Sequence, residues 1–318
     1  RVDIFGIRKE AKIDAELIAP LRPEVPTLEP GRSYLLETVI RTVKLGHLFT
    51  QGTVDSNDIW LEVIVRDGDR IIATSGDRNE AGDVDPSAHR VNVFVIDREG
   101  NRINRRNAQD IFTALYNHQI PPGAGQTVHY ELNVPESVSG PLSIELKLHY
   151  RKFDAEYLRI IQQAEKDAKI KTPGFDHTER FRDLPITLLG RDYVVFPVAG
   201  SDAKAENEPS PIVPWQRWND FGIGLLLKKG MIGERKQAIV AFKEVEKLGR
   251  YDGPLNLART YEREGDTGEA IAALARAAKH DDPPAPPWTV AWLSGVLKRK
   301  QTNLFEAEKN LRAALEMR

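Results

Sequence analysis

The histidines are the residues of this chain with the clearest potential for chemistry. The 318-residue sequence contains seven of them and no cysteine. An imidazole can bind a metal, move a proton or pair with a carboxylate near neutral pH. The absence of cysteine excludes a disulfide framework, a thiolate metal site, a cysteine nucleophile and covalent haem attachment within these residues. Candidate chemistry therefore rests on imidazoles and carboxylates.

His47 lies in a segment, residues 44–56, whose composition suits the approach of a planar ligand. Gly46 has no side chain, so a bulky group can come close to the backbone beside the histidine. Phe49 offers an aromatic ring that can pack on the face of such a group. A surface or hydrogen-bonded structural role is the alternative for this histidine.

Two further histidines lie beside loops. His118 stands in residues 117–125, where prolines followed by glycines form a loop that is first rigid and then flexible. Such a loop could present an imidazole outward. His89 directly precedes the strand-like residues 91–96. A structural role is again the alternative for both.

The remaining histidines have ordinary explanations. His129 and His149 fall inside strand patterns, so we expect half-buried residues of a sheet. His177 lies in a polar loop. His280 lies at the end of a predicted helix, where a cation complements the helix dipole.

Two charged clusters are weaker candidates. An acidic turn with Asp77, Asp83 and Asp85 could supply oxygen ligands to calcium, but it lacks the full spacing of a calcium loop, and a solvated turn is the alternative. A basic cluster could dock an anionic partner, with a solvated hairpin face as the alternative; it comprises Arg98, Arg102, Arg105 and Arg106. No phosphate loop, nucleophile motif or acid–base pair marks an active site, so we do not expect an enzyme.

Alternation of apolar and polar residues with period two marks the strands in the first half of the chain. One face of each strand is then buried and the other is wet, as in an antiparallel sheet. The alternating runs are residues 34–43, 59–65, 91–96, 127–134 and 142–150, with a further strand-like run at 184–198. This pattern predicts an antiparallel β-sandwich over residues 1–200, with a helical excursion around residues 154–172.

From residue 215 the periodicity becomes helical and repeats. Small residues at the repeated spacing let the two helices of a hairpin approach closely, and large residues fill the gaps. The repeated positions are Gly222, Ala258 and Gly295; Ala238, Ala270 and Ala307; Phe242, Leu274 and Leu311; and Val245, Ala277 and Ala314. The pattern resembles the tetratricopeptide repeat, whose period is about 34 residues. We predict about three such repeats over residues 215–318, after a linker at 201–214, with Trp215 and Trp218 anchoring the two domains together.

Charge and hydropathy exclude other classes of partner. The 45 basic and 47 acidic residues nearly cancel, which gives no reason to expect nucleic acid or an anionic membrane. No apolar run approaches the roughly 18 residues needed to span a bilayer. The chain opens at Arg1 without a methionine and already in an apolar alternation, so we expect it to be a piece of a longer polypeptide.

The segment Gly46-His47-Leu48-Phe49-Thr50-Gln51-Gly52, followed by Ile59-Trp60-Leu61-Glu62-Val63, resembles a segment of multihaem c-type cytochromes. In that family a Gly-His-x-Phe-Pro-x-Gly loop before a Trp-Leu-Glu-Val strand is thought to supply a distal axial ligand to haem. The likeness runs through residues 104–112 and 215–220 and covers nearly the whole chain. It is to the C-terminal half of bacterial multihaem cytochromes that carry tetratricopeptide repeats. Thr50 stands where the family loop usually has proline, and Cys-x-x-Cys-His is absent.

The resemblance implies that haem c is attached to an upstream segment or to a partner chain. This chain would then be a haem-free accessory portion of a periplasmic or extracellular cytochrome, providing distal histidine ligation and docking for electron transfer to a redox partner. His47 is the first choice of axial ligand, followed by His118 and His89, and the basic cluster could hold a haem propionate. The ligating ring must leave one nitrogen free for iron while a carbonyl or carboxylate holds the other.

Two alternatives from other functional classes stay open. The first is a protein–protein interaction scaffold, in which the sandwich and the repeats bind partners and the histidines are structural. The second is a hydrolase or carbohydrate-active module, which rests only on the chemistry that sandwich folds often host.

Overall fold

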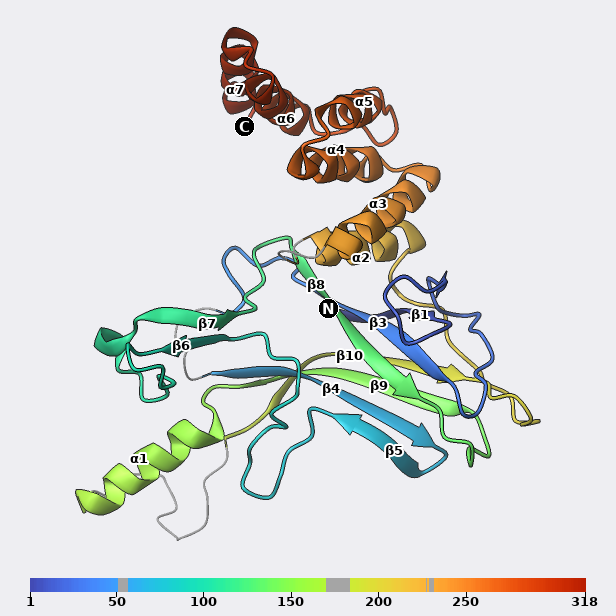
Figure 1. Cartoon of the computed structure of the whole chain (residues 1–318), viewed down its shortest axis with the longest axis vertical. Helices are drawn as coiled ribbons and strands as arrows, with labels where there is room; N and C mark the ends of the chain where they lie inside the picture. The colour runs from blue at the N-terminus through green and yellow to red at the C-terminus, as the bar shows by residue number, and fades with distance from the viewer. Residues whose placement is uncertain (51–56, 170–183, 227, 229–231) are drawn as a thin grey trace.

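Figure 1 shows the chain in a computed structural model that describes residues 1–50, 57–169, 184–226, 228 and 232–318. The strands are β1 (Val2–Arg8), β2 (Leu17–Ile18), β3 (Ser33–Arg41), β4 (Asp58–Asp67), β5 (Arg70–Ser75), β6 (Val93–Ile96), β7 (Thr113–Asn117), β8 (Gly125–Asn133), β9 (Leu142–Arg151) and β10 (Thr187–Phe196). The helices are α1 (Ala155–Asp167), α2 (Pro214–Leu226), α3 (Ile232–Lys247), α4 (Asp252–Glu264), α5 (Thr267–Ala278), α6 (Pro287–Lys300) and α7 (Leu304–Glu316), with a 3₁₀ turn η1 (Ala108–Asp110). The predicted order, antiparallel strands followed by helices, is confirmed.

Two strands, β5 and β7, escape the alternation rule. Most of their residues are exposed, so neither strand has a buried face to impose a period of two. Every residue of β1 is buried, because helices cover the side of its sheet that would otherwise face solvent.

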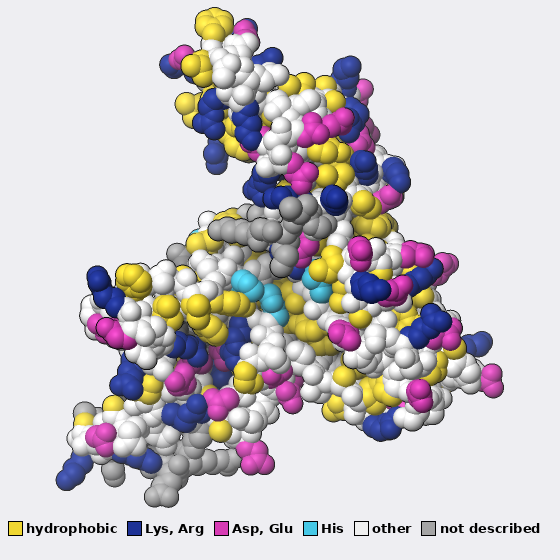
Figure 2. Space-filling view, viewed as in Figure 1, with side chains coloured by type: hydrophobic (Ala, Val, Ile, Leu, Met, Phe, Trp, Pro, Cys, Tyr) yellow, Lys and Arg dark blue, Asp and Glu magenta, His cyan; other side chains and the backbone are white. Residues whose placement is uncertain are grey.

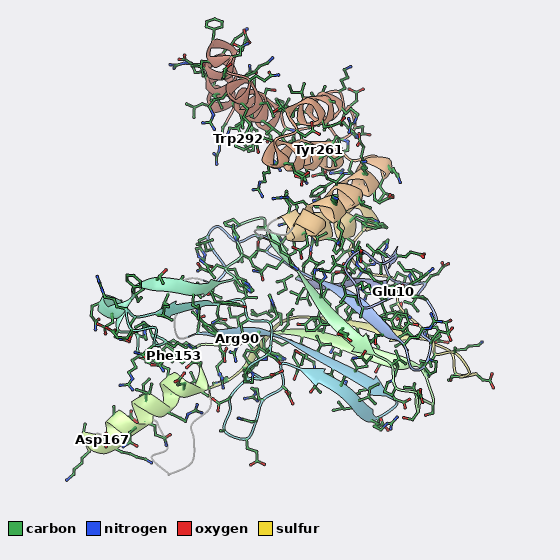
Figure 3. The ribbon with its side chains drawn as sticks, in the orientation of Figure 1. Glu10, Arg90, Phe153, Asp167, Tyr261 and Trp292 are labelled. Atoms are coloured by element: carbon green, nitrogen blue, oxygen red, sulfur yellow. The ribbon has the colours of Figure 1, made fainter. Side chains whose placement is uncertain are left out.

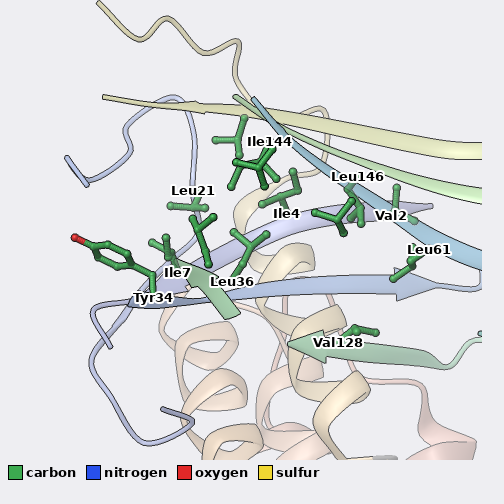
Figure 4. Close-up of a cluster of buried hydrophobic side chains, with 14 of the residues drawn as sticks. Val2, Ile4, Ile7, Leu21, Tyr34, Leu36, Leu61, Val128, Ile144 and Leu146 are labelled. Atoms are coloured by element: carbon green, nitrogen blue, oxygen red, sulfur yellow. The ribbon is translucent and has the colours of Figure 1, made fainter. Parts of the chain in front are cut away.

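Two four-stranded antiparallel sheets share one hydrophobic core. Their strand orders are β2-β1-β3-β8 and β10-β9-β4-β5, and β6 and β7 form a separate two-stranded ribbon. Figure 4 shows side chains of β1 and β3, such as Ile4 and Leu36, together with Ile144 and Leu146 of β9. All four are at most 1% exposed. Burial of these strand faces from water is the main stabilising contribution to this part of the fold.

The helices follow one another as antiparallel pairs, α2 with α3, α4 with α5, and α6 with α7. The small residues of the sequence repeat lie where paired helices touch. A Cβ on Gly222 would lie 2.6 Å from the ring of Phe242, and a Cβ on Gly295 would lie 2.7 Å from Leu311. Any side chain at these positions would separate the two helices of a pair.

Helix α2 joins the helices to the first sheet, as Figure 1 shows. Phe5 of β1 stacks on Phe221 at 4.4 Å and meets the edge of Trp218 at 4.9 Å. These aromatic rings belong to the same buried cluster as the helix pairs. The packing of Trp218 against the sheet agrees with its predicted role as an anchor.

The predicted linker has no helix or strand between residues 201 and 213. It is nevertheless tied to the second sheet, because the Asn207 amide donates to the carbonyl of Val195 and accepts from its N–H, both at 2.8 Å. None of the described helices combines the length and hydropathy of a membrane span.

Candidate functional site

His47 lies in the loop that leaves β3, and its side chain is exposed. Its Nδ1 is 3.3 Å from the carbonyl oxygen of Leu48. A carbonyl only accepts, so in this contact Nδ1 carries the proton and Nε2 keeps its lone pair. That tautomer leaves a free imidazole nitrogen at the surface. Residues 51–56, which include Gln51 and Gly52 of the predicted loop motif, lie outside the described residues.

The backbone around His47 is held on one side and open on the other. Phe49 exchanges two backbone hydrogen bonds with Ile120, of 2.9 and 2.5 Å, and its ring packs against the core between the sheets. Among the described residues, no heavy atom lies within 4 Å of the place where Gly46 would carry a Cβ, its two chain neighbours aside. The described part of the chain therefore leaves the space beside Gly46 open to an incoming group.

His89 and His118 are brought together as a stacked pair. Their ring centroids are 5.1 Å apart with an interplanar angle of 26°. Gln126 of β8 connects them, because its Oε1 lies 3.0 Å from His89 Nε2 and its Nε2 donates at 2.7 Å to the carbonyl of His118. The amide oxygen accepts, so His89 carries its proton on Nε2. Both rings are partly buried.

Burial keeps this pair neutral. It lowers the pKa of His89 from 6.5 to about 4 and also lowers the pKa of His118. The positive charge of Lys228 acts in the same direction on both rings. The Nδ1 atom of His118 is buried and has no hydrogen-bond partner among the described residues. A partly buried pair of neutral imidazoles therefore lies next to the His47 loop.

The three predicted histidines thus occupy adjoining loops but not one cluster. The Phe49–Ile120 pairing joins the loop of His47 to the loop that follows His118. Among the described residues, His47 makes no hydrogen bond or ring contact with the stacked pair. The structure separates one exposed ring from two that are partly buried.

Exposed apolar side chains surround this region. The β3–β4 loop exposes Val43, Leu45 and Leu48 by 37–45%, and the β6–β7 ribbon exposes Ile111, Phe112 and Leu115 by 41–71%. Figure 2 shows the hydrophobic patch over β6 and β7 with histidine side chains beside it. A contiguous apolar patch of this kind is typical of a surface that binds a partner.

Two residues of the site escaped the sequence prediction. Gln126 carried no local signal, because its role depends on two rings brought from other segments. The ring of Tyr116 lies 3.8 Å from that of His118 at a tilt of 40°, and its hydroxyl donates to the carbonyl of Arg90 at 2.6 Å. Burial raises the pKa of Tyr116 to about 12. Tyr116 lies in β7, and His118 follows directly after the end of that strand.

The acidic calcium candidates lie apart from the histidines, along a polar cavity of about 710 Å³. Arg90, labelled in Figure 3, lies at the wall of this cavity near the start of α1. Asp83 forms an ion pair with Arg159 at 2.7 Å. Asp85 accepts hydrogen bonds from the backbone N–H and the hydroxyl of Ser87. Asp77 lines the same cavity.

No metal-binding group forms among these acids. Across the described part of the chain, no three His, Asp or Glu side chains are arranged to hold a metal ion. The calcium hypothesis therefore has no coordination site in this structure.

The predicted basic cluster is also divided. Arg102 pairs with Asp154 at 3.1 Å and lies over the ring of Phe94 at 4.2 Å. Arg98 and Arg106 lie over the rings of Phe112 and Phe153, respectively. The charge of Arg102 is thus neutralised within the chain. His129 and His149 lie partly buried on β8 and β9, and His177 lies outside the described residues.

Comparison with known proteins adds a distant likeness. No protein-family model matches the chain, and no curated protein matches it. Among solved structures, it is similar to a penta-heme cytochrome c552 from Thermochromatium tepidum, with a TM-score of 0.37 and 13% sequence identity. The likeness covers 52% of this chain and 36% of the cytochrome chain, so this chain spans about a third of that protein. We therefore base the functional proposal on the geometry of the histidine loops.

Proposed function

We propose that this chain is a haem-free accessory portion of a multihaem c-type cytochrome and supplies the Nε2 atom of His47 as an axial ligand. One observation carries the proposal: His47 is exposed while the Leu48 carbonyl holds its Nδ1 at 3.3 Å. This is the arrangement that a ligating histidine needs, with one nitrogen held and the other free. Among the described histidines, only His47 is exposed.

The residues present fit haem c on a separate segment or chain. The sequence has no cysteine, so a haem that meets His47 must be attached elsewhere. The space beside Gly46, which the described residues leave open around a Cβ position, supports the approach of a planar group. The fixed pairing of Phe49 with Ile120 holds the loop in place. When bound, haem supplies one-electron transfer, with a potential that the axial ligand tunes.

The second half of the proposal is a docking surface, the apolar rim formed by the exposed apolar side chains of the β3–β4 loop and the β6–β7 ribbon. Leu48 and Phe112 are 42% and 60% exposed. Covering such side chains contributes about 25 cal/mol per Å² of buried apolar area. We expect the haem-bearing polypeptide to bury this rim and to exclude water from the iron ligand.

His89 and His118 take supporting roles in this proposal. The Nε2 of His89 is engaged by Gln126, and the stacked rings cannot both turn toward one iron without breaking the stack. They fill the space under the adjoining loops. We read the two sheets as a β-sandwich, the helix pairs as a tetratricopeptide-type stack, and the location as periplasmic or extracellular.

The test titrates the full chain into a haem c peptide with one open axial position and follows the Soret band. The chain is expected to convert the haem to its low-spin form, and H47A should weaken this effect at least tenfold. H280A is the matched control, because His280 also has its Nδ1 against a carbonyl, that of Pro283 at 2.9 Å, but lies among the helices. No conversion, or an equal loss in both variants, contradicts the proposal.

A second candidate function, a protein–protein interaction scaffold, is favoured by the surface of α6. Trp288 and Trp292 are 39% and 43% exposed there, and Figure 3 labels Trp292 on this helix. Large exposed aromatic residues are common anchors of protein interfaces. The scaffold candidate predicts that W292A weakens capture of a partner while the haem titration is unchanged.

A further inference from the structure

Arg259 of α4 is partly buried, and it has no carboxylate partner among the described residues. Its Nη1 donates at 2.9 Å to Oδ1 of Asn256. Among the described residues, no Asp or Glu oxygen lies within 4.0 Å of its guanidinium. Buried cations are normally paired, because removing a charge from water without a partner is costly.

Other buried arginines of this chain follow that rule. Arg8 pairs with Glu37 at 2.5 Å, and Arg217 pairs with Asp3 at 2.9 Å. Arg259 differs from both. Burial and the nearby charge of Arg263 lower its pKa, although the charge of Asp252 acts in the opposite direction.

A chain of buried amides orients this cation. Asn256 is 5% exposed and donates through Nδ2 at 2.8 Å to Oδ1 of Asn219 on α2, which is 7% exposed. The Oδ1 of Asn256 then faces Arg259. The Asn256 amide thereby engages one side of the guanidinium of Arg259. The Nε and Nη2 atoms on the other edge make no hydrogen bond to a described residue. That edge is the part that binds a carboxylate with two parallel hydrogen bonds.

Arg263 lies one helical turn after Arg259 and is exposed. Its Nη1 donates at 3.2 Å to the carbonyl of Leu226 at the end of α2, so both cations lie along the contact between α2 and α4. Residues four apart on a helix are about 6 Å apart. Alternate residues of an extended peptide, which share one face, are about 6.5 Å apart.

We propose that Arg259 and Arg263 bind an acidic peptide, with one carboxylate on the free edge of Arg259 and a second on Arg263. The spacing matches two successive carboxylates on one face of an extended segment better than one compact anion. The site is independent of the histidine loops and does not rest on the haem proposal. The peptide carboxylate on Arg259 is the counter-ion that this residue lacks among the described residues.

The test measures binding of fluorescein-labelled octaglutamate to the full chain by fluorescence anisotropy. R259Q removes the charge but keeps a donor for Asn256, and we expect it to weaken binding at least tenfold. R312Q is the control, because Arg312 is 73% exposed and already paired with Glu308. Absence of binding to the parent chain, or an equal loss in the two variants, overturns the proposal.

Two further measurements separate the proposal from its competitors. If Arg259 awaits a ligand, the melting temperature of peptide-free R259Q should equal or exceed that of the parent chain; a decrease of several degrees identifies a structural arginine and overturns the proposal. At equal ionic strength, inorganic phosphate should compete with octaglutamate no better than acetate does. Stronger competition by phosphate assigns the site to a phosphate ligand and also overturns the proposal.

Discussion

Arg217 of α2 and Asp3 of β1 are joined by two hydrogen bonds of 2.9 Å, and their side chains are only 2% and 6% exposed. The same guanidinium also donates to the carbonyls of Leu21 and Ile4. One arginine thus connects helix α2 to strand β1, across 214 residues of the chain. The helices and the sheets are held together by a buried ion pair as well as by aromatic packing.

Removing one partner of this pair should destabilise the chain strongly. R217M leaves the Asp3 carboxylate buried without its main partner, which costs about 3–5 kcal/mol. Urea unfolding followed by circular dichroism measures the change. R312M, in an exposed ion pair, should cost no more than about 1 kcal/mol. Similar losses for the two variants would show that Arg217 does not join the two parts.

His129 should make stability depend on pH above neutrality. Burial opposes its charge, but hydrogen bonds to Glu234 at 3.2 Å and to Glu37 at 2.5 Å outweigh burial and raise its pKa above 6.5. The folded chain therefore holds this proton more tightly than the unfolded chain does. The contribution is complete below pH 6.5 and is lost as the pH rises through the folded-state pKa.

The measurement is the free energy of unfolding between pH 6 and 9 for the parent chain and H129Q. The difference between them should shrink as the pH rises. H149Q serves as the control on another strand. A difference between parent and H129Q that stays constant over this range contradicts the prediction.

His89 should make stability depend on pH in the opposite direction, below neutrality. Its folded-state pKa of about 4 lies below the ordinary 6.5, so the unfolded chain binds the proton more tightly. Its contribution is complete above pH 6.5 and is lost as the pH falls toward 4, by up to about 3 kcal/mol. Nuclear magnetic resonance of the ring protons should show no titration of His89 between pH 8 and 5.5. A midpoint near 6.5 would mean that the ring is solvated.

Gly222 should not tolerate a side chain. The Cβ of G222A would meet the ring of the fully buried Phe242, and overpacking of this kind costs about 1–3 kcal/mol. G268A is the matched control in an exposed part of α5, where the nearest atom is 3.8 Å away and the helix propensity of alanine should stabilise by up to about 1 kcal/mol. Thermal melts of the two variants should shift in opposite directions. A stabilised G222A would show that the contact of α2 with α3 is loose.

Local pattern predicted the regular elements well where one face is buried. The alternation over residues 142–150 corresponds to β9, and the helical period places Gly222 and Gly295 at helix contacts. It failed for β5 and β7, because most residues of both strands are exposed. Periodicity reports a difference between two faces of an element, so an element without that difference is silent.

In the candidate site, too, local sequence predicted some features and missed others. Loop composition pointed to His47, His89 and His118. Whether each ring is exposed, stacked or held by an amide depends on partners from distant segments, such as Gln126 and Ile120. These long-range contacts leave no trace in local spacing.

The sequence alone determined the antiparallel strands, the helical second part, the loops that carry histidine and the exclusion of covalent haem attachment, because each depends on residue type or on local period. The tertiary structure decided that His47 keeps a free nitrogen at the surface, that Arg102 is neutralised by Asp154, and that Arg259 is partly buried without a carboxylate partner among the described residues. Burial and pairing of charges arise only when segments far apart in the chain meet, so no reading of the sequence could assign them.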